Sequence, residues 1–310
     1  MLVLDAASVR ELLDPAELAD ALRLAFRSIS DGSASVPPRV AALTPEGLLG
    51  TMPGYVPGCG LGAKLVTYFR HNHERGLPGH QALIALFDPD DGRPLALMDG
   101  THITGMRTAM AAAVAASALA RPGAAIVTVV GTGVQGREHV AAFRLLFPAA
   151  SVQVTGRTPD HVRAVASAYA DVEAVLDIEE AVRRADVVCL ASDAVDPVIA
   201  RSWLAEGCHV SSVGAGVEVD AETVAAARVF VESRTAAVQP FPAGSRELSG
   251  RDPESLTEVG EVLLGTRAGR DSPEQLTLYK SMGHATQDVV AAAVVYRAAL
   301  AAGAGSTLSL

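Results

Sequence analysis

A glycine-rich stretch directly after an apolar run constrains the fold of this 310-residue chain more than any other feature. Residues 126–130 read I-V-T-V-V, a β-branched run typical of a buried strand. The sequence G-T-G-V-Q-G follows, and residues 137–147 then have the composition of a helix. In such a turn Gly131 permits a tight bend, Gly133 lets the backbone approach a pyrophosphate, and Gly136 lets the helix pack on the strand. The unpaired N–H groups that begin the helix favour an anion.

The position of this glycine motif between a strand and a helix decides how we interpret it. A G-x-G-x-x-G sequence alone is weak, but one that ends a strand and begins a helix is a much stronger signal for a dinucleotide. We therefore predict dinucleotide binding here. A glycine-rich turn with a purely structural role is the alternative.

The second half of the chain alternates apolar strands with helices. Strands are expected at 127–130, 151–156, 173–177, 186–192 and 209–214, and helices at 137–147, 160–170 and 179–184. Strands separated by helices predict a parallel, doubly wound sheet of the Rossmann type. Residues 242–272 are polar and are expected to form a loop with a short helix.

The first half has a different pattern. Residues 14–29 form an amphipathic helix with Asp14 as N-cap and Pro15 in the first turn. Short strands and turns alternate over 41–100, and an Ala-rich helix covers 103–120. This pattern predicts a mixed α+β domain in an α/β protein. The last helix, near 284–302, is expected to return to it.

Composition excludes several classes of function. The net charge is −10 and no basic stripe marks a nucleic-acid binder. The N-terminus lacks the pattern of a signal peptide, and apolar runs are too short or interrupted to span a membrane. Cys59, Cys189 and Cys208 form no C-x-x-C pair, which favours buried thiols in the cytoplasm. Eight dispersed histidines predict no metal site.

Ordered motifs outside the glycine loop carry a family resemblance. They are P-R (38–39), G-A-K-L-V-T (62–67), G-L-P (76–78), L-A-L-M-D-G-T-H-I-T-G-M-R-T-A (95–109), D-P-V-I (196–199), W-L-A-E-G-C-H-V (203–210) and Y-K-S-M-G-H-A-T-Q-D (279–288). Together they resemble the ornithine cyclodeaminase/mu-crystallin family. The resemblance implies a homodimer that transfers hydride between nicotinamide and an amine or imine carbon. It also implies a substrate and dimerisation domain over 1–120, completed by 286–310, and an NAD(P)-binding Rossmann domain over 121–285.

Two arginines are predicted to bind the substrate, a small imine or amino acid with a carboxylate. Arg39 matches the family arginine that holds this carboxylate, because a guanidinium pairs with it bidentately. A surface arginine after a Pro-Pro turn is the alternative. Arg107 lies in an apolar helix, where a charge must find a partner. A substrate carboxylate or a cofactor phosphate would supply that partner.

Lys64 is the predicted catalytic residue. It lies in an apolar strand, where burial lowers the pKa of an ammonium group toward neutrality and suits it to proton transfer. The matching family lysine contacts the substrate and is a candidate acid or base. A lysine on the solvent face of the strand is the alternative. Ser281 and Met282 match the family segment near the nicotinamide and substrate.

The end of the second Rossmann strand predicts the cofactor. NAD-preferring sites carry an acid there for the ribose 2′-OH, whereas this chain reads G-R-T at 156–158. An arginine accommodates a 2′-phosphate, so NADP(H) is predicted to be preferred, with NAD(H) possible. If Arg157 merely faces solvent, both cofactors bind. The predicted cofactor contacts are Arg107, Gly131, Gly133, Val134, Gln135, Gly136, Arg157, Thr158, Ser192, Gly214 and Ser281.

One position departs from the family pattern. Ornithine cyclodeaminases carry an aspartate where this chain has Gly216, and Glu218 is a weak candidate to replace it. Asp220 is expected to cap the next helix. We therefore expect an NADPH-dependent imine or ketimine reductase or an amino-acid dehydrogenase. An ornithine or lysine cyclodeaminase with bound NAD is the second hypothesis, and a non-catalytic, crystallin-like cofactor and ligand binder is the third.

Overall fold

The computed structural model describes residues 1–309. The chain divides into two compact units: Met1–Arg107 with the residues from His284 onward, and Thr108–Gly283. The sequence prediction put the boundaries at 120/121 and 285/286, and its last segment, 286–310, ends on a residue outside the described range. The functional roles given to the two parts stay predictions. Within residues 1–309, no helix is long and apolar enough to cross a membrane.

The first unit is built on a mostly antiparallel sheet. Among the described residues it has seven strands in the order β15-β1-β6-β5-β4-β3-β2. Only β1 and β6 run parallel to each other. The strands are β1 (Leu2–Leu4), β2 (Val40–Leu43), β3 (Leu48–Val56), β4 (Gly60–Tyr68), β5 (His80–Phe87), β6 (Pro94–Asp99) and β15 (Ser306–Thr307). A 3₁₀ turn, η1 (Arg70–Arg75), links β4 to β5.

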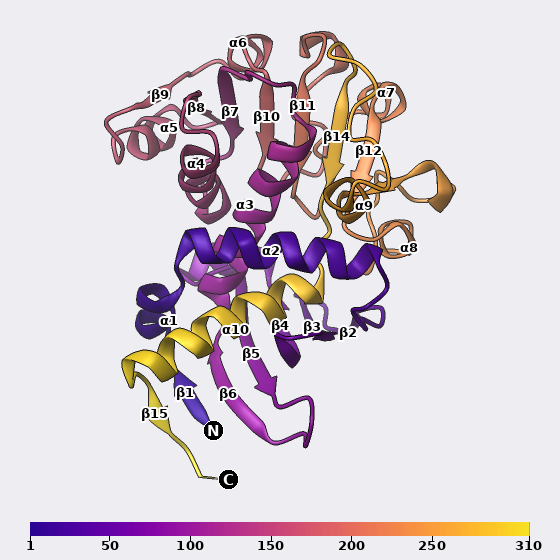
Figure 1. The fold of residues 1–310 in the computed structure, drawn as a ribbon. Helices are drawn as coiled ribbons and strands as arrows, with labels where there is room; N and C mark the ends of the chain where they lie inside the picture. The colour runs from indigo at the N-terminus through magenta and orange to yellow at the C-terminus, as the bar shows by residue number, and fades with distance from the viewer. Residues whose placement is uncertain (310) are drawn as a thin grey trace. The chain divides into compact units, whose positions relative to one another are not determined.

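In the part of the first unit that the structure describes, three α-helices accompany the sheet (Figure 1): α1 (Ala6–Leu12), α2 (Pro15–Ser30) and α10 (Ala285–Ala302). The Asp14 side chain accepts hydrogen bonds from the first-turn amides and so fixes the start of α2. Helix α10 is buried along most of its length and packs against α2 and against β3, β4 and β5. The C-terminal helix therefore covers one face of the N-terminal sheet.

The second unit contains the predicted parallel sheet. Within the described chain its eight strands have the order β9-β8-β7-β10-β11-β14-β12-β13, and each neighbouring pair is parallel. They are β7 (Ile126–Val130), β8 (Ser151–Thr155), β9 (Val172–Ala174), β10 (Val187–Leu190), β11 (His209–Ser212), β12 (Arg228–Val231), β13 (Thr257–Glu258) and β14 (Thr277–Lys280). The order reverses between β7 and β10, which is the switch point where doubly wound sheets bind ligands. The predicted Rossmann fold is confirmed.

The helices of this unit connect successive strands. They are α3 (Gly100–Leu119), which begins in the first unit, α4 (Val134–Leu146), α5 (Pro159–Ala166), α6 (Ile178–Arg183), α7 (Ala221–Ala226), α8 (Arg234–Ala237) and α9 (Val259–Leu264), with 3₁₀ turns η2 (Arg201–Trp203) and η3 (Pro253–Ser255). Asp220 caps α7 as predicted. The sequence prediction missed β12, which follows directly after α7, and β14, which runs into the Y-K-S-M-G motif that was assigned to ligand binding.

Candidate active site

Lys64 lies on the covered face of the first sheet. Along β4, Gly60, Gly62 and Lys64 alternate inward, and Lys64 pairs in register with Met52 and Ile84. Its side chain is only 2% exposed. It points toward α10, where its Nζ lies 2.8 Å from Asp288 Oδ2 and donates to Oδ1 at 3.0 Å. The predicted alternative, a lysine on a solvent face, is therefore wrong.

Arg107 binds the same carboxylate. Its guanidinium is buried, and Nε donates to Asp288 Oδ1 at 3.0 Å while Nη1 donates to Gln287 Oε1 at 2.9 Å. The sequence predicted that the Arg107 charge must have a partner, and the carboxylate of Asp288 is one such partner. Asp288 belongs to the first turn of α10, where the helix dipole also favours a negative charge.

Burial and charge tune the proton affinities in this cluster. Burial lowers the pKa of Lys64 to about 7, and the Arg107 charge acts in the same direction against the attraction of Asp288. Burial alone would raise the pKa of Asp288, but Arg107 and Lys64 outweigh it and hold that pKa below its usual value. Arg39, half-buried just before β2, also lowers the Lys64 pKa, so its charge lies near the cluster.

Three of the four substrate residues expected from the sequence lie close together in the first unit, whereas the fourth, Met282, belongs to the second unit. Arg39, Lys64 and Arg107 come from separate segments. Lys64 and Arg107 both pair with Asp288, and the Arg39 charge lies close enough to lower the Lys64 pKa. The cluster carries more positive than negative charge, which suits a carboxylate ligand. The sequence reasoning missed Asp288 and Gln287. Asp288 could have been found as the acid that ends the motif Y-K-S-M-G-H-A-T-Q-D, at the start of an Ala- and Val-rich helix.

Close backbone approaches at two glycines, and open space at the third, shape the glycine loop of the second unit. Gly131 has φ +139°, and a Cβ there would lie 2.4 Å from the Ala191 carbonyl oxygen. At Gly136 a Cβ would lie 2.0 Å from the Gly131 carbonyl oxygen. At Gly133, by contrast, a Cβ would meet no described atom within 4 Å. Gly133 is the N-cap of α4 and supplies no side-chain cap, and the buried Oε1 of Gln135 has no partner in the described residues. The residues present therefore fit a bound dinucleotide phosphate.

The other predicted cofactor residues of this unit follow the ends of parallel strands. Arg157 and Thr158 follow β8 and are exposed, Ser192 follows β10, Gly214 follows β11 and Ser281 follows β14. Because carboxyl ends of parallel strands meet at one edge, the sheet gathers these positions beside the glycine loop. This edge is the binding edge of doubly wound sheets.

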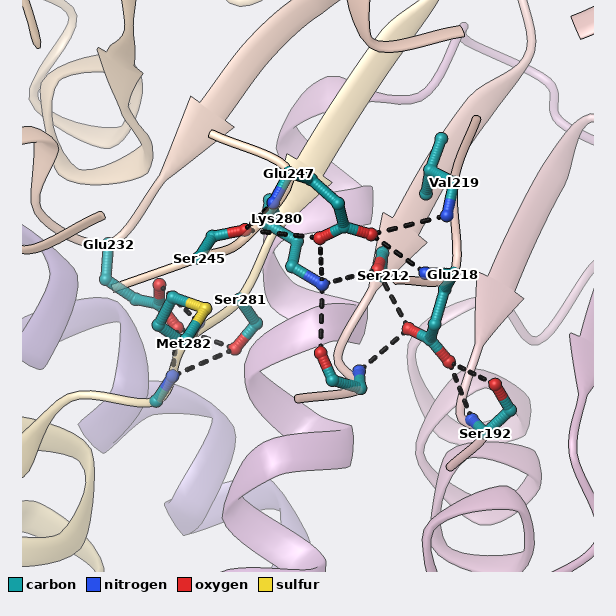
Figure 2. A network of polar contacts seen from close by, with 12 residues as sticks. Ser192, Ser212, Glu218, Val219, Glu232, Ser245, Glu247, Lys280, Ser281 and Met282 are labelled. Atoms are coloured by element: carbon teal, nitrogen blue, oxygen red, sulfur yellow. Dashed lines mark hydrogen bonds and ion pairs between the residues drawn. The ribbon is translucent and has the colours of Figure 1, made fainter. Parts of the chain in front are cut away.

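A buried carboxylate joins two of these positions (Figure 2). Glu218 is 0% exposed; its Oε1 accepts from the backbone N–H and Oγ of Ser192, both at 2.7 Å. Its Oε2 accepts from the Gly214 N–H at 2.7 Å and from Ser212 Oγ at 2.8 Å. The carboxylate is therefore engaged inside the unit rather than placed to replace the cyclodeaminase aspartate.

Further buried charged side chains contact the residues that follow the carboxyl ends of the strands. Lys280 Nζ lies 2.5 Å from Glu247 Oε2 and donates to Ser212 Oγ and the Gly214 carbonyl, both at 2.9 Å. Glu232, to the left of this group in Figure 2, accepts from Ser281 Oγ at 2.6 Å and from the Met282 N–H at 3.2 Å. The sequence reasoning missed Glu232 and Glu247, since isolated acids in separate segments carry no spacing signal.

The structure explains the glycine at 216. A Cβ there would lie 1.9 Å from the Ala194 carbonyl oxygen, so this backbone has no room for an aspartate. Among the described residues, no group of three or more His, Cys, Asp and Glu side chains is arranged to hold a metal ion.

Comparison with known proteins agrees with this architecture. The model of the ornithine cyclodeaminase/mu-crystallin family matches residues 1–303. The chain belongs to this family. It is 36% identical over 279 residues to the ketimine reductase mu-crystallin of Mus musculus, covering 87% of each chain.

Solved structures match this chain over nearly its whole length. A Δ1-pyrroline-2-carboxylate reductase from Thermococcus litoralis, in complex with NADH and L-proline, matches with a TM-score of 0.92 and 30% identity, covering 99% of this chain and 100% of that one. A lysine cyclodeaminase structure matches with a TM-score of 0.88 and 26% identity, covering 100% and 95%. Both reductases and cyclodeaminases thus share this architecture.

Proposed function

We propose that this chain reduces the C=N bond of small 2-imino carboxylates, cyclic ketimines included, with NADPH as preferred hydride donor and NADH as an alternative. The observation that carries the proposal is the buried Lys64–Asp288–Arg107 cluster with Arg39 beside it. The reverse reaction, oxidation of a 2-amino carboxylate, uses the same groups. Relatives that include a ketimine reductase and a pyrroline carboxylate reductase support this reaction class.

The arginines would hold the substrate carboxylate. A guanidinium has five N–H donors. In Arg107, Nε and one N–H of Nη1 are engaged by Asp288 and Gln287, which leaves the remaining donors for a ligand. Asp288 thus fixes the guanidinium and leaves it able to bind. Arg39 would supply the second cation.

Lys64 would supply the proton. Reduction of C=N adds hydride to carbon and a proton to nitrogen, so a proton donor is needed beside the imine. With a pKa of about 7, the Lys64 ammonium gives up its proton near neutral pH more readily than an ordinary lysine. Asp288 keeps part of the population protonated. A reduced nicotinamide, when bound, supplies the hydride.

Preference for NADPH follows from the end of β8. No acid stands there for a ribose 2′-OH, while Arg157 and Thr158 are exposed beside the expected ribose position. A 2′-phosphate would pair with the guanidinium. NADH would bind more weakly through the same glycine loop, and the Thermococcus relative is described with NADH.

The reaction is tested by following the hydride. NADPH deuterated at C4, in each of its two stereoisomers, is incubated with a cyclic ketimine carboxylate, and the amino acid product is analysed by mass spectrometry. One stereoisomer should place a single deuterium on the carbon that bears the carboxylate. Product without deuterium from either stereoisomer would contradict the proposal.

The two other hypotheses are less well supported. Cyclodeamination needs a carboxylate that position 216 cannot carry, and Glu218 is bound within its own network. A non-catalytic binder would have no use for a buried lysine whose pKa lies near neutrality. Release of ammonia from ornithine would support the cyclodeaminase hypothesis. No turnover of either the ketimine or ornithine would support the non-catalytic binder.

We further propose a homodimer formed through the first sheet. The face opposite α10 exposes large apolar side chains, which is unusual for a surface left in water. They are Val40, Leu49, Leu61, Leu65 and Leu83. A second copy of the chain is the expected cover. The free cysteines favour the cytoplasm as its location.

A further inference from the structure

We infer that Glu218 is a positioning residue for the nicotinamide half of the bound dinucleotide. It holds the loops after β10 and β11 in their binding shape without itself contacting the cofactor. The inference rests on the proposed function, because it presupposes a bound dinucleotide.

The hydrogen bonds of Glu218 are saturated by these two loops. An ionised carboxylate offers about four lone-pair sites, and four donors occupy them. Two come from Ser192, two residues beyond β10, one from Gly214, two residues beyond β11, and one from Ser212 at the end of β11. A Cβ on Gly214 would lie 2.5 Å from the Glu218 carboxyl carbon, so the loop backbone packs directly on the carboxylate.

The two loops lie on one side of the switch point. In doubly wound sheets the dinucleotide spans this point, with the adenosine ribose near the end of the second strand, here β8. The other mononucleotide half then faces the loops after β10 and β11. Glu218 therefore shapes loops that face the nicotinamide half. The glycine loop and Arg157 are predicted to contact the pyrophosphate and the adenosine half, and Glu218 does not shape them.

The ion pair between Glu247 and Lys280 holds the Glu218 backbone in place. Glu247 Oε1 accepts from the Glu218 N–H at 2.9 Å, and its other oxygen pairs with Lys280. Lys280 in turn donates to Ser212 and to the Gly214 carbonyl. Both polar groups of the Gly214 backbone are thereby bound, the N–H by Glu218 and the carbonyl by Lys280 (Figure 2). Such preorganisation lowers the cost of ordering a loop on binding.

The test compares a whole cofactor with a fragment. Isothermal titration calorimetry measures the dissociation constants of NADPH, of NADH and of 2′-phospho-ADP-ribose, which lacks nicotinamide, for the unaltered chain and for Glu218→Gln. The amide nitrogen of glutamine cannot accept, so two of the four donors lose their partner. We expect NADPH to bind about tenfold more weakly or worse, as for a lost charge-assisted hydrogen bond. The fragment should change by no more than about twofold.

Asp186→Asn is the matched control. Asp186 is also a buried carboxylate that accepts two backbone amides, from Ala125 at 2.7 Å and Ile126 at 3.0 Å, but it lies at the amino end of β10. It should lower the melting temperature and leave both dissociation constants within about twofold. Ser212→Ala removes one donor to Glu218, and with it one acceptor of Lys280, without adding bulk or charge. It should weaken NADPH binding about threefold and serves if Glu218→Gln does not fold.

Three results decide the matter. Unchanged NADPH binding in Glu218→Gln and Ser212→Ala would overturn the inference, and so would equal weakening of NADPH and the fragment. If the unaltered chain bound neither NADPH nor NADH, the proposed function itself would fail, and the inference with it.

Discussion

The proton affinity of Lys64 is set by its burial and by the charges of Arg107, Asp288 and Arg39, and this predicts a pH dependence of the reaction. Its pKa is lowered from 10.5 to about 7 by burial and by Arg107, against Asp288. The proposed proton donor must be protonated, so kcat/KM for ketimine reduction should be highest below pH 7 and fall as pH rises through about 7. The measurement is steady-state kinetics from pH 5.5 to 9 at about constant ionic strength.

Asp288→Asn and Lys64→Arg test whether this titration belongs to Lys64. Removing the Asp288 charge removes the one attraction that raises the Lys64 pKa, so the fall in rate should move to lower pH. Lys64→Arg keeps the charge but cannot release a proton near neutrality, so its rate should drop sharply at every pH. An unchanged profile in Asp288→Asn would contradict the assignment.

Arg39 allows a test of substrate binding that spares the buried ion pair. Arg39→Met should raise KM for the imino carboxylate about 10- to 100-fold, the effect of losing a charge-assisted pair worth about 1.5–3 kcal/mol. The residue is only half-buried, so folding should be retained. Since the contact is made equally in ground and transition states, kcat should change little. A normal KM would remove Arg39 from the site.

At the scale of elements, two glycines of one loop should respond differently to alanine. Gly136→Ala places a methyl group 2.0 Å from a carbonyl oxygen between β7 and α4, and should cost about 1–3 kcal/mol of folding free energy. Gly133→Ala meets no described atom within 4 Å, and as an N-cap change should cost at most about 1 kcal/mol. It should nevertheless abolish dinucleotide binding, because the methyl group would occupy the space predicted for the pyrophosphate. Thermal unfolding and calorimetry separate the two effects, and tight binding by Gly133→Ala would refute the loop assignment.

The turn after β8 carries the cofactor prediction. Arg157→Ala should lower the preference for NADPH over NADH about tenfold, because only the 2′-phosphate contact is lost. The ratio of kcat/KM values for the two cofactors measures it. An unchanged ratio would mean that Arg157 only faces solvent. Asp160→Ala, in the first turn of α5, is a nearby control that alters charge at a position not predicted to contact the ribose.

The sequence predicted most elements, with boundaries that local physics explains. The glycine motif and the β-branched runs identified the Rossmann strands β7, β8, β10 and β11. Helix α4 begins at Val134 rather than at 137, since the helix starts inside the glycine motif. The expected strand at 173–177 shortens to Val172–Ala174, because Asp177 instead caps α6.

At the scale of the whole molecule, the site depends on contacts that no local pattern encodes. Lys64 and Asp288 are 224 residues apart in sequence and meet because α10 returns to the first sheet. The sequence predicted Lys64 and Arg107 from their residue type and apolar surroundings, and Arg39 from its match to a family motif. The partner acids, Asp288 here and Glu218 in the second unit, become visible only when the chain is folded.

The outer face of the first sheet predicts the assembly. Leu65 and Leu83 pair directly across β4 and β5, and are 42% and 49% exposed. Leu65→Glu should put a charge into the proposed dimer interface and yield monomers in analytical ultracentrifugation. Glu11→Lys, on an exposed position of α1, should leave the assembly unchanged. A monomeric unaltered chain would contradict the proposed homodimer.

The most direct test of the account is the substrate itself. The purified chain is given a cyclic ketimine carboxylate with NADPH, and reduced-nicotinamide absorbance is followed, while ornithine with NAD is assayed in parallel for ammonia and proline. We predict rapid NADPH oxidation with the ketimine and no ammonia from ornithine. Ammonia and proline from ornithine, without ketimine reduction, would contradict it and would require a carboxylate other than one at position 216 to serve cyclodeamination.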